Sequence, residues 1–210
     1  LGDVYKRQFQ ESFALARDAG FANINVDLMS GLPEQSEKKW EESLRTIAEL
    51  SPEHISAYSL IVEPGTPFAE QKLDLPDEDT EREMYARTAE ILAEYGFFQY
   101  EISNYARKGY ACRHNLGYWS RRDYKGFGLG ASSLLNSVRS TVQEDLTEYL
   151  RGNFAGSSEH LSEQDIREEY FFLGLRKMEG VDPGPYREHY EKLLEELQKQ
   201  QLLQEKNGKI

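Results

Sequence analysis

The pattern of hydrophobic and polar positions alternates between two periods over the first hundred residues. Phe9, Phe13 and Ala16 recur at helical spacing until Gly20 ends the stripe, whereas apolar and polar positions alternate over residues 22–29. The same switch from a helical to a strand period recurs further along the chain. Helices are therefore predicted over about residues 37–50 and 77–95, and strands over residues 22–29, 54–62 and 97–102.

This alternation predicts an α/β fold with parallel strands joined by right-handed crossovers. In such folds ligands bind at the carboxyl ends of the strands, and loops with unusual residues follow each predicted strand. Asp27 lies on the polar face of the first strand, where its carboxylate could accept hydrogen bonds from a ribose diol. A carboxylate that caps the following turn is the alternative. The loop over residues 63–67 either forms a rigid turn or holds its backbone groups against a flat ligand.

The end of the chain is predicted to form a separate, mainly helical domain. Residues 153–160 are typical of a linker, and Ser162 with Asp165 forms a capping-box pattern at the start of a helix. A domain boundary is therefore expected near residue 155, with the helical domain over residues 156–210. The region before it is predicted to contain a polar and aromatic loop over residues 103–119, two short strands within 123–142 and a short helix from residue 144.

Composition and charge narrow the class of protein. Apolar residues make up 39% of the chain and aromatic residues 12%, so a core can form. The formal net charge of −12 repels the phosphate backbone, which argues against general nucleic-acid binding. No apolar run is long enough to span a bilayer, so no transmembrane segment is expected. The single cysteine cannot form an internal disulfide, which favours the reducing cytoplasm.

Both ends of the sequence look interrupted. Residues 1–8 lack periodicity and resemble translated vector sequence, so they are interpreted as a non-native leader, with the first domain over residues 9–155. Asn207 and Gly208 form a type I′ turn signal with no second strand after it. The chain is therefore expected to be a piece truncated at both ends.

One stretch, ACRHNLGYWS over residues 111–120, concentrates residues that could carry chemistry. Cys112 and His114 have no second ligand pair nearby, which argues against a zinc site. On an extended segment their side chains point to opposite faces, which argues against a nucleophilic pair. An imidazole beside aromatic rings can bind a porphyrin, so His114 with Tyr118 and Trp119 suits a heme site. A buried loop histidine anchored by aromatic side chains is the alternative.

Two further features favour structural roles. The glycine run GFGLGA over residues 126–131 has the spacing G-x-G-x-G, whereas cradling a dinucleotide phosphate requires G-x-G-x-x-G between a strand and a helix. Close backbone packing is therefore favoured over phosphate binding at this run. His54, His160 and His189 have no partners at ligand spacing and are interpreted as structural or surface residues.

Four stretches together resemble one family. They occur in the order and roughly the spacing of the oxygen-independent coproporphyrinogen-III-oxidase-like radical SAM proteins, and they are most similar to the HemW-type heme-chaperone branch. The resemblance covers about residue 9 to the end of the chain, including a helical C-terminal domain. The stretches are GFANINVDLMSGLPEQS, AYSLIVEPGTPF, YEISNYARKGYACRHNLGYW and YKGFGLGAS.

The resemblance implies the later half of a partial (βα) radical SAM barrel, followed by a small, mainly helical domain. Members of the family carry a [4Fe-4S] cluster on a CxxxCxxC motif and bind S-adenosylmethionine. This sequence lacks the motif, so the cluster ligands are expected in a missing N-terminal half. Asp27, Ile61 and Ile102 match the positions at which the family contacts S-adenosylmethionine.

The resemblance also assigns a heme site. His114, Asn115, Tyr118 and Trp119 match the HNxxYW motif that is linked to heme binding in the chaperone branch, with His114 as the expected contact to the heme iron. The family often has a histidine after GxGxGA, where this sequence has Ser132, so a second histidine contact to heme is in doubt.

The implied function is a heme chaperone that binds heme and S-adenosylmethionine and delivers heme to haem-accepting proteins. The alternative is an enzyme of porphyrin biosynthesis, an oxygen-independent coproporphyrinogen III dehydrogenase, in which a radical abstracts hydrogen from propionate side chains. A third interpretation is a parallel α/β scaffold whose loops only pack. No catalytic residue is assigned, and the chain by itself is expected to be inactive.

Overall fold

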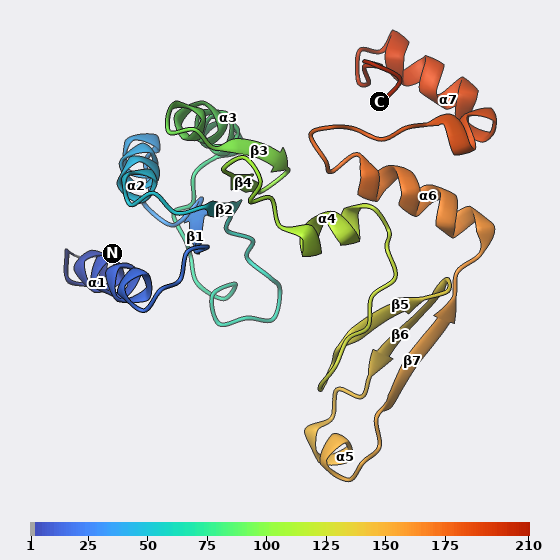
Figure 1. Cartoon of the computed structure of the whole chain (residues 1–210), viewed down its shortest axis with the longest axis horizontal. Helices are drawn as coiled ribbons and strands as arrows, with labels where there is room; N and C mark the ends of the chain where they lie inside the picture. Colours follow the sequence, from blue (N-terminus) through green and yellow to red (C-terminus); the bar gives the residue numbers. More distant parts are fainter. Residues whose placement is uncertain (1–2) are drawn as a thin grey trace. The chain divides into compact units, whose positions relative to one another are not determined.

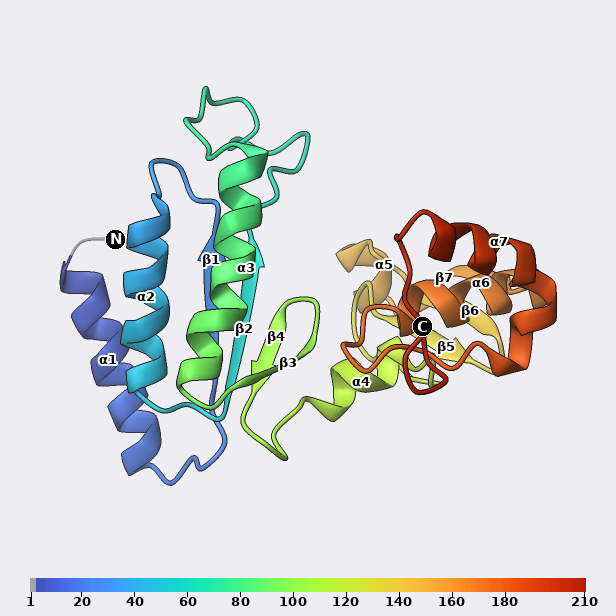
Figure 2. The same ribbon diagram turned by 90° about the horizontal axis from the view of Figure 1, so that it is seen from above.

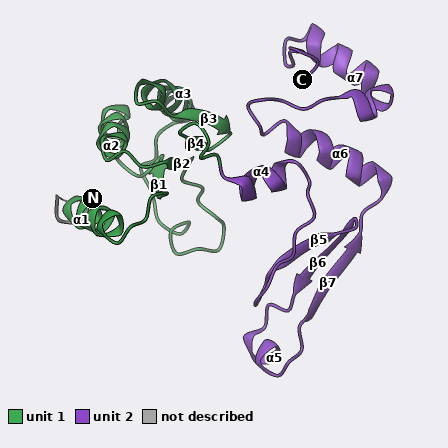
Figure 3. Cartoon of the chain, in the orientation of Figure 1, with its two compact units in different colours: residues 1–111 green, residues 112–210 purple. Residues whose placement is uncertain are grey.

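The computed structural model describes residues 3–210, and the chain separates into two units, residues 1–111 and 112–210 (Figure 3). The expected boundary near residue 155 coincides with the start of a strand inside the second unit. Of the predicted leader, residues 1 and 2 lie outside the described residues, and residues 3–8 belong to the first helix.

The first unit is a mixed sheet with helices packed against it (Figures 1 and 2). Its strands lie in the order β1-β2-β4-β3, and β1 pairs with β2 in parallel, as predicted. The helices are α1 (Asp3–Asp18), α2 (Glu37–Glu49) and α3 (Glu78–Glu94), and the strands are β1 (Asn25–Ser30), β2 (His54–Ser59), β3 (Phe98–Glu101) and β4 (Asn104–Ala106).

The prediction of a purely parallel sheet is wrong, because a short strand inserts between β2 and β3. This strand, β4, runs antiparallel to both neighbours and was predicted as part of a loop. The chain can reverse after β3 because the buried carboxylate of Glu101 accepts a hydrogen bond from the Ser103 backbone N–H at 3.0 Å and another from the Asn104 side-chain amide. As a result of this reversal, the strand that pairs with β2 is β4, and β3 pairs with the other edge of β4.

The core of the first unit forms where the helices cover the sheet. The apolar face of α2 lies in this core, since Trp40, Leu44 and Ile47 are all buried. The helix begins after Ser36, whose hydroxyl accepts a hydrogen bond from the Lys39 N–H and thereby satisfies one amide of the first turn. Burial of this face supplies most of the driving force that holds α2 on the sheet.

The second unit contains a three-stranded antiparallel sheet, order β5-β6-β7, together with several helices (Figure 1). The two short strands predicted within residues 123–142 are confirmed as β5 and β6. The predicted layout is wrong in two places: residues 153–160 include a strand rather than a linker, and residues 113–119 form a helix rather than a loop. The elements are α4 (Arg113–Trp119), β5 (Ser132–Leu135), β6 (Val138–Val142), α5 (Leu146–Leu150), β7 (Ala155–His160), α6 (Glu163–Gly174), the 3-10 helix η1 (Gly184–Tyr186) and α7 (Arg187–Lys199).

Helices dominate after residue 161, as predicted. The capping box at the start of α6 is confirmed, because Ser162 and Asp165 each bond to the other's backbone N–H. The Asn-Gly turn also forms, with φ of 54° at Asn207 and 75° at Gly208, and it returns the chain so that Ile210 exchanges two backbone hydrogen bonds with Val181. None of the helices in the described part of the chain is long and apolar enough to cross a membrane.

A buried carboxylate joins three elements of the second unit. Glu169 on α6 is 6% exposed and accepts hydrogen bonds from Arg121, which follows α4, and from Arg139 on β6. The Nε of Arg121 lies 2.8 Å from Glu169 Oε2. The side chains of Glu169 and Arg121 are largely buried, so neither charge can be hydrated fully. Removing one of these partners would therefore leave the other as an uncompensated buried charge and weaken the link between helices and sheet.

Candidate functional site

The first part of the candidate site is the polar face of strands β1 and β2. Side chains on β1 alternate, so Val26 and Ser30 are buried while Asn25 and Asp27 are exposed on the opposite face. Asp27 therefore stands where the sequence placed it, on a polar strand face. Its Oδ1 accepts a hydrogen bond from Asn25 Nδ2 at 2.6 Å. This contact holds the carboxylate through a neighbour on its own strand.

His54, which was predicted to be a structural or surface residue, lies at the centre of this face. His54, at the start of β2, is 6% exposed, with Nδ1 2.6 Å from Asn25 Oδ1 and Nε2 2.8 Å from the Tyr100 hydroxyl. Burial lowers the pKa of His54, against the opposing influence of the Glu101 and Asp27 carboxylates. The imidazole is thus kept neutral by its surroundings.

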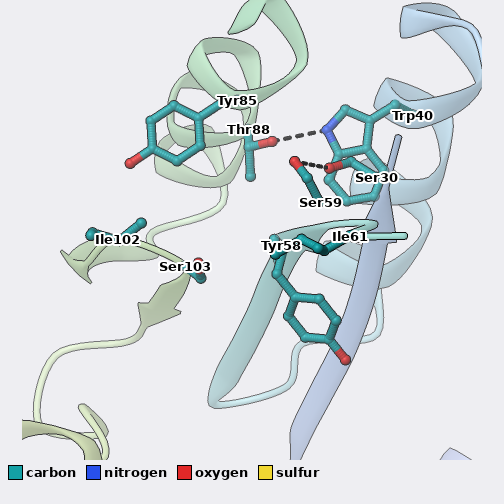
Figure 4. Close-up of a pocket in the computed structure, with 10 residues that line it drawn as sticks. Ser30, Trp40, Tyr58, Ser59, Ile61, Tyr85, Thr88, Ile102 and Ser103 are labelled. Carbon is teal, nitrogen blue, oxygen red and sulfur yellow. Dashed lines mark hydrogen bonds between the residues drawn. The ribbon is translucent and has the colours of Figure 1, made fainter. Parts of the chain in front are cut away.

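A cavity of about 240 Å³ lies at the carboxyl end of the same strands, beside α3 (Figure 4). Ile61 and Ile102, from the loops after β2 and β3, both line it, so the structure brings two of the predicted ligand contacts together. Asp27 is not among the lining residues. Hydroxyl groups and aromatic rings complete the wall, which consists of Ser30, Trp40, Ala57, Tyr58, Ser59, Tyr85, Thr88 and Ser103 besides the two isoleucines.

The second part of the candidate site is helix α4, which carries the HNxxYW residues. The premise that Cys112 and His114 lie on an extended segment is wrong, because Cys112 is the N-cap and His114 lies in the first turn. Residues two apart on a helix are still separated by about 200° around its axis, so their side chains again diverge. His114 is exposed, which excludes the alternative of a buried loop histidine.

Aromatic contacts hold His114 from one side. Its ring meets Tyr118, one turn later, edge to face at a centroid distance of 4.6 Å, and Tyr118 meets Tyr124 in the same way at 4.6 Å. Tyr124 is fixed in turn by two backbone hydrogen bonds with Leu134 of β5. Tyr124 was not predicted, although its position six residues after Tyr118 follows the motif directly. The guanidinium of Arg176 lies 5.0 Å from the ring centre of the remaining motif aromatic, Trp119.

Comparison with known proteins shows similarity to one group of curated proteins along most of the chain. The chain is 40% identical over 208 residues to the heme chaperone HemW of Bacillus subtilis, covering 94% of this chain and 55% of that protein. HemW of Haemophilus influenzae is 36% identical over 195 residues, covering 90% and 51%, and HemW of Escherichia coli is 34% identical over 187 residues, covering 86% and 50%. Over most of its length the chain is therefore similar in sequence to HemW heme chaperones. It spans about half the length of the curated relatives it matches.

The fold has a counterpart among solved structures. Escherichia coli coproporphyrinogen III oxidase (HemN), a radical SAM enzyme, superposes with a TM-score of 0.74 at 22% identity, over 94% of this chain and 53% of that one. No family model matches the sequence. At this identity the likeness establishes the α/β fold alone, and the similarity to HemW rests on the sequence relatives.

The residues of this chain do not suit an iron–sulfur cluster. The sequence has one cysteine and no CxxxCxxC motif, and Cys112 caps α4 in the second unit. Among residues 3–210 no group of three or more His, Cys, Asp or Glu side chains is arranged to hold a metal ion. A [4Fe-4S] cluster therefore needs ligands from outside these 210 residues.

The glycine run over residues 126–131 packs against a strand backbone and does not form a phosphate cradle. A Cβ at Gly126 would lie 2.3 Å from the Ser132 carbonyl oxygen, and the Gly126 N–H donates to Ser133 Oγ at 3.1 Å. Strand β5 follows the run, whereas phosphate cradling needs a helix there. The predicted close packing is confirmed.

Replacing Gly126 with alanine is expected to lower the free energy of unfolding by about 1–3 kcal/mol, because the new methyl must push a strand backbone aside. Urea unfolding followed by far-UV circular dichroism measures the change. Gly117→Ala is the matched control, since a Cβ at that helical position meets its nearest neighbour only at 4.0 Å. Equal midpoints for the two variants would show that the close approach is not a constraint.

Proposed function

We propose that this chain is part of a heme chaperone of the radical SAM superfamily, with heme held by the second unit and S-adenosylmethionine by the first. The observation that carries the proposal is the exposed imidazole of His114, presented on a helix and held by Tyr118. The names of its HemW relatives support the same assignment.

His114 fits the role of an iron contact on chemical grounds. An imidazole nitrogen is a common axial ligand of heme iron, and neighbouring aromatic rings offer apolar surface to the macrocycle. The edge-to-face contact with Tyr118 restricts rotation of the imidazole, so less conformational entropy is lost on binding. Asn115 and Trp119, on the same helix, would complete the contact surface.

S-adenosylmethionine would be held by three groups of the first unit. The exposed carboxylate of Asp27 can accept hydrogen bonds from the two ribose hydroxyls, and Ile61 and Ile102 offer apolar contact from the wall of their shared cavity. The fit of these residues is chemical: one acceptor for a diol and an apolar wall for the adenosine. We assign none of them a catalytic step.

The proposed partners are heme or a related porphyrin and proteins that accept heme, and the proposed location is the cytoplasm. The net charge of −12 again argues against a nucleic-acid partner. An oxygen-independent coproporphyrinogen III dehydrogenase is the alternative, and the HNxxYW motif on α4 favours the chaperone. The whole arrangement would be the later half of a partial (βα) barrel with a smaller C-terminal domain.

The experiment that tests the proposal is a heme titration of the chain followed by the Soret band. Wild-type protein is expected to shift the band, and His114→Ala is expected to weaken heme binding at least tenfold and to abolish the spectral signature of imidazole ligation. His189→Ala, which removes another exposed histidine of the same unit, should bind as wild type does.

Two results would contradict the heme assignment. Heme spectra that His114→Ala leaves unchanged would remove the iron contact from α4. Decarboxylation of coproporphyrinogen by a cluster-loaded form, with heme binding indifferent to position 114, would favour the dehydrogenase instead.

A second prediction concerns the cluster. Anaerobic reconstitution of this 210-residue chain with iron and sulfide is expected to leave no iron–sulfur absorbance after desalting, because one cysteine cannot hold a cluster. Cys112→Ser should behave identically. A stable visible absorption band that disappears in Cys112→Ser would mean that the chain assembles a cluster through this cysteine, by association of copies.

A further inference from the structure

The hydrogen bonds around His54 allow one arrangement of protons. Asn25 Nδ2 lies 2.6 Å from Asp27 Oδ1, and an ionised carboxylate can only accept hydrogen bonds, so the Asn25 amide must turn its nitrogen toward Asp27. Its oxygen then faces His54 Nδ1 at 2.6 Å. An amide oxygen can only accept, so Nδ1 carries the proton.

The other side of the ring completes the arrangement. With the proton on Nδ1, the neutral imidazole accepts at Nε2, where the Tyr100 hydroxyl lies 2.8 Å away and donates. Burial of His54 favours this neutral form. A directed chain of hydrogen bonds thus runs from Tyr100 through His54 and Asn25 to the carboxylate of Asp27, across strands β3, β2 and β1.

We propose that His54 is a positioning residue that fixes the orientation of the Asp27 carboxylate through Asn25, with Tyr100 selecting the required tautomer. The inference rests on the proposed function, in which Asp27 binds the ribose hydroxyls of S-adenosylmethionine. A carboxylate on an exposed strand face has several accessible rotamers, and binding a ribose diol requires one of them. The His54 N–H holds the Asn25 amide in the orientation that selects it.

The neighbouring hydroxyl cannot replace His54 in this role. Ser56 Oγ lies 3.3 Å from Asn25 Oδ1 but 2.7 Å from Asn104 Oδ1, and a hydroxyl has one hydrogen to give. The shorter contact takes it, and Asn104 is itself held by the buried Glu101. The orientation of Asn25 therefore depends on the His54 N–H.

Two substitutions at one position separate positioning from packing. His54→Asn places an amide N–H near the site of Nδ1 and can keep the bond to Asn25. His54→Gln extends its amide toward the site of Nε2 and can keep the bond to Tyr100 instead. Both are smaller than histidine and neutral, so a residue that only fills space predicts similar behaviour for the two.

The first measurement is NMR spectroscopy of the chain, which needs no ligand. Ring nitrogen shifts should report the Nδ1–H tautomer of His54, and side-chain couplings should report a single Asp27 rotamer in wild type and His54→Asn but averaged rotamers in His54→Gln. Averaged couplings in wild type, an Nε2–H tautomer, or identical couplings in the two variants would overturn the proposal. If His54→Gln does not fold, Tyr100→Phe serves instead and should yield a mixture of tautomers; an unchanged tautomer would overturn the role of Tyr100.

The second measurement is a titration of the same proteins with S-adenosylmethionine. His54→Gln is expected to weaken binding about tenfold, a loss of the size that orienting partners cause at metal sites, whereas His54→Asn should stay within about threefold of wild type. Equal losses in both variants would overturn positioning. If wild type does not bind S-adenosylmethionine while its Asp27 rotamer is fixed as described, the cofactor assignment of the proposed function fails and the positioning of Asp27 stands.

Discussion

Replacing Glu169 with alanine is expected to lower the free energy of unfolding of the second unit by about 3–5 kcal/mol. The carboxylate is the common partner of Arg121 and Arg139, and its side chain is only 7% exposed. Removing it deprives both guanidinium groups of their shared anion, and only Arg139 keeps a second carboxylate, Glu159, nearby. Arg139, 39% exposed, can turn toward water, but Arg121 is 14% exposed and cannot do so without unpacking α4 from α6.

The orphaned charge on Arg121 explains why this effect should be large. Its Nη2 is already buried without a hydrogen-bond partner among the described residues, so the bond from Nε to Glu169 is its main compensation. Glu159 provides the control: it lies 3.9 Å from Arg139 with its side chain 64% exposed, and exposed pairs contribute little. Glu159→Ala should leave stability nearly unchanged.

The chain contains a convenient reporter for each unit. It has two tryptophans, Trp40 in the first unit and Trp119 in the second. Urea unfolding of Glu169→Ala, followed by Trp119 fluorescence in a Trp40→Phe background, therefore measures the second unit alone. A midpoint equal to that of Glu159→Ala would show that the buried ion group is not required for stability.

The elements that the sequence predicts well are those with long, regular patterns. Helix α2 was predicted over residues 37–50 and spans Glu37–Glu49, because apolar positions at helical spacing from Trp40 to Ala48 follow a strong cap at Ser36. The parallel pairing of β1 and β2 follows from the strand–helix–strand order alone. In both cases local pattern and tertiary packing favour the same structure.

The elements that were missed are short and depend on distant partners. Strand β4 is three residues long, too short for any alternation to be seen, and it exists because β2 and β3 offer pairing on both sides. Helix α4 is seven residues long, includes Gly117 and has no side-chain cap, so its sequence resembles a loop. Strand β7 is exposed along its whole length, which removes the apolar alternation that identifies strands.

Some residues of the candidate site could likewise be predicted from the sequence, and others could not. Ile61 and Ile102 were singled out by the family resemblance, and they do share a cavity. His54 could not be predicted as the centre of a polar network, because its partners Asn25 and Tyr100 lie 29 and 46 residues away in the sequence. Ligand-spacing rules detect partners on one element, whereas the partners of His54 come from two other strands, β1 and β3.

Replacing Trp40 with alanine is expected to cost about 3–5 kcal/mol of stability in the first unit. The ring is 1% exposed and packs in the core between α2 and α3, where its Nε1–H donates to Thr88 Oγ1 at 2.9 Å and to the Met84 carbonyl at 3.2 Å. Truncation leaves a large void beside the cavity that Ile61 and Ile102 also line. Far-UV circular dichroism during urea unfolding measures the loss, while Trp119 fluorescence shows whether the second unit still folds.

Trp40→Phe separates packing from hydrogen bonding at this position. Phenylalanine keeps most of the apolar surface, and loss of the indole donor leaves no buried donor without a partner, because the Thr88 hydroxyl still donates to the Met84 carbonyl. We therefore expect a loss of roughly 1–2 kcal/mol. If the phenylalanine variant were as unstable as the alanine variant, the indole hydrogen bonds would be the larger contribution. If both variants were as stable as wild type, the packing of α2 on α3 would not depend on Trp40. The wall of the neighbouring cavity would then have to be held by the other buried residues of the core.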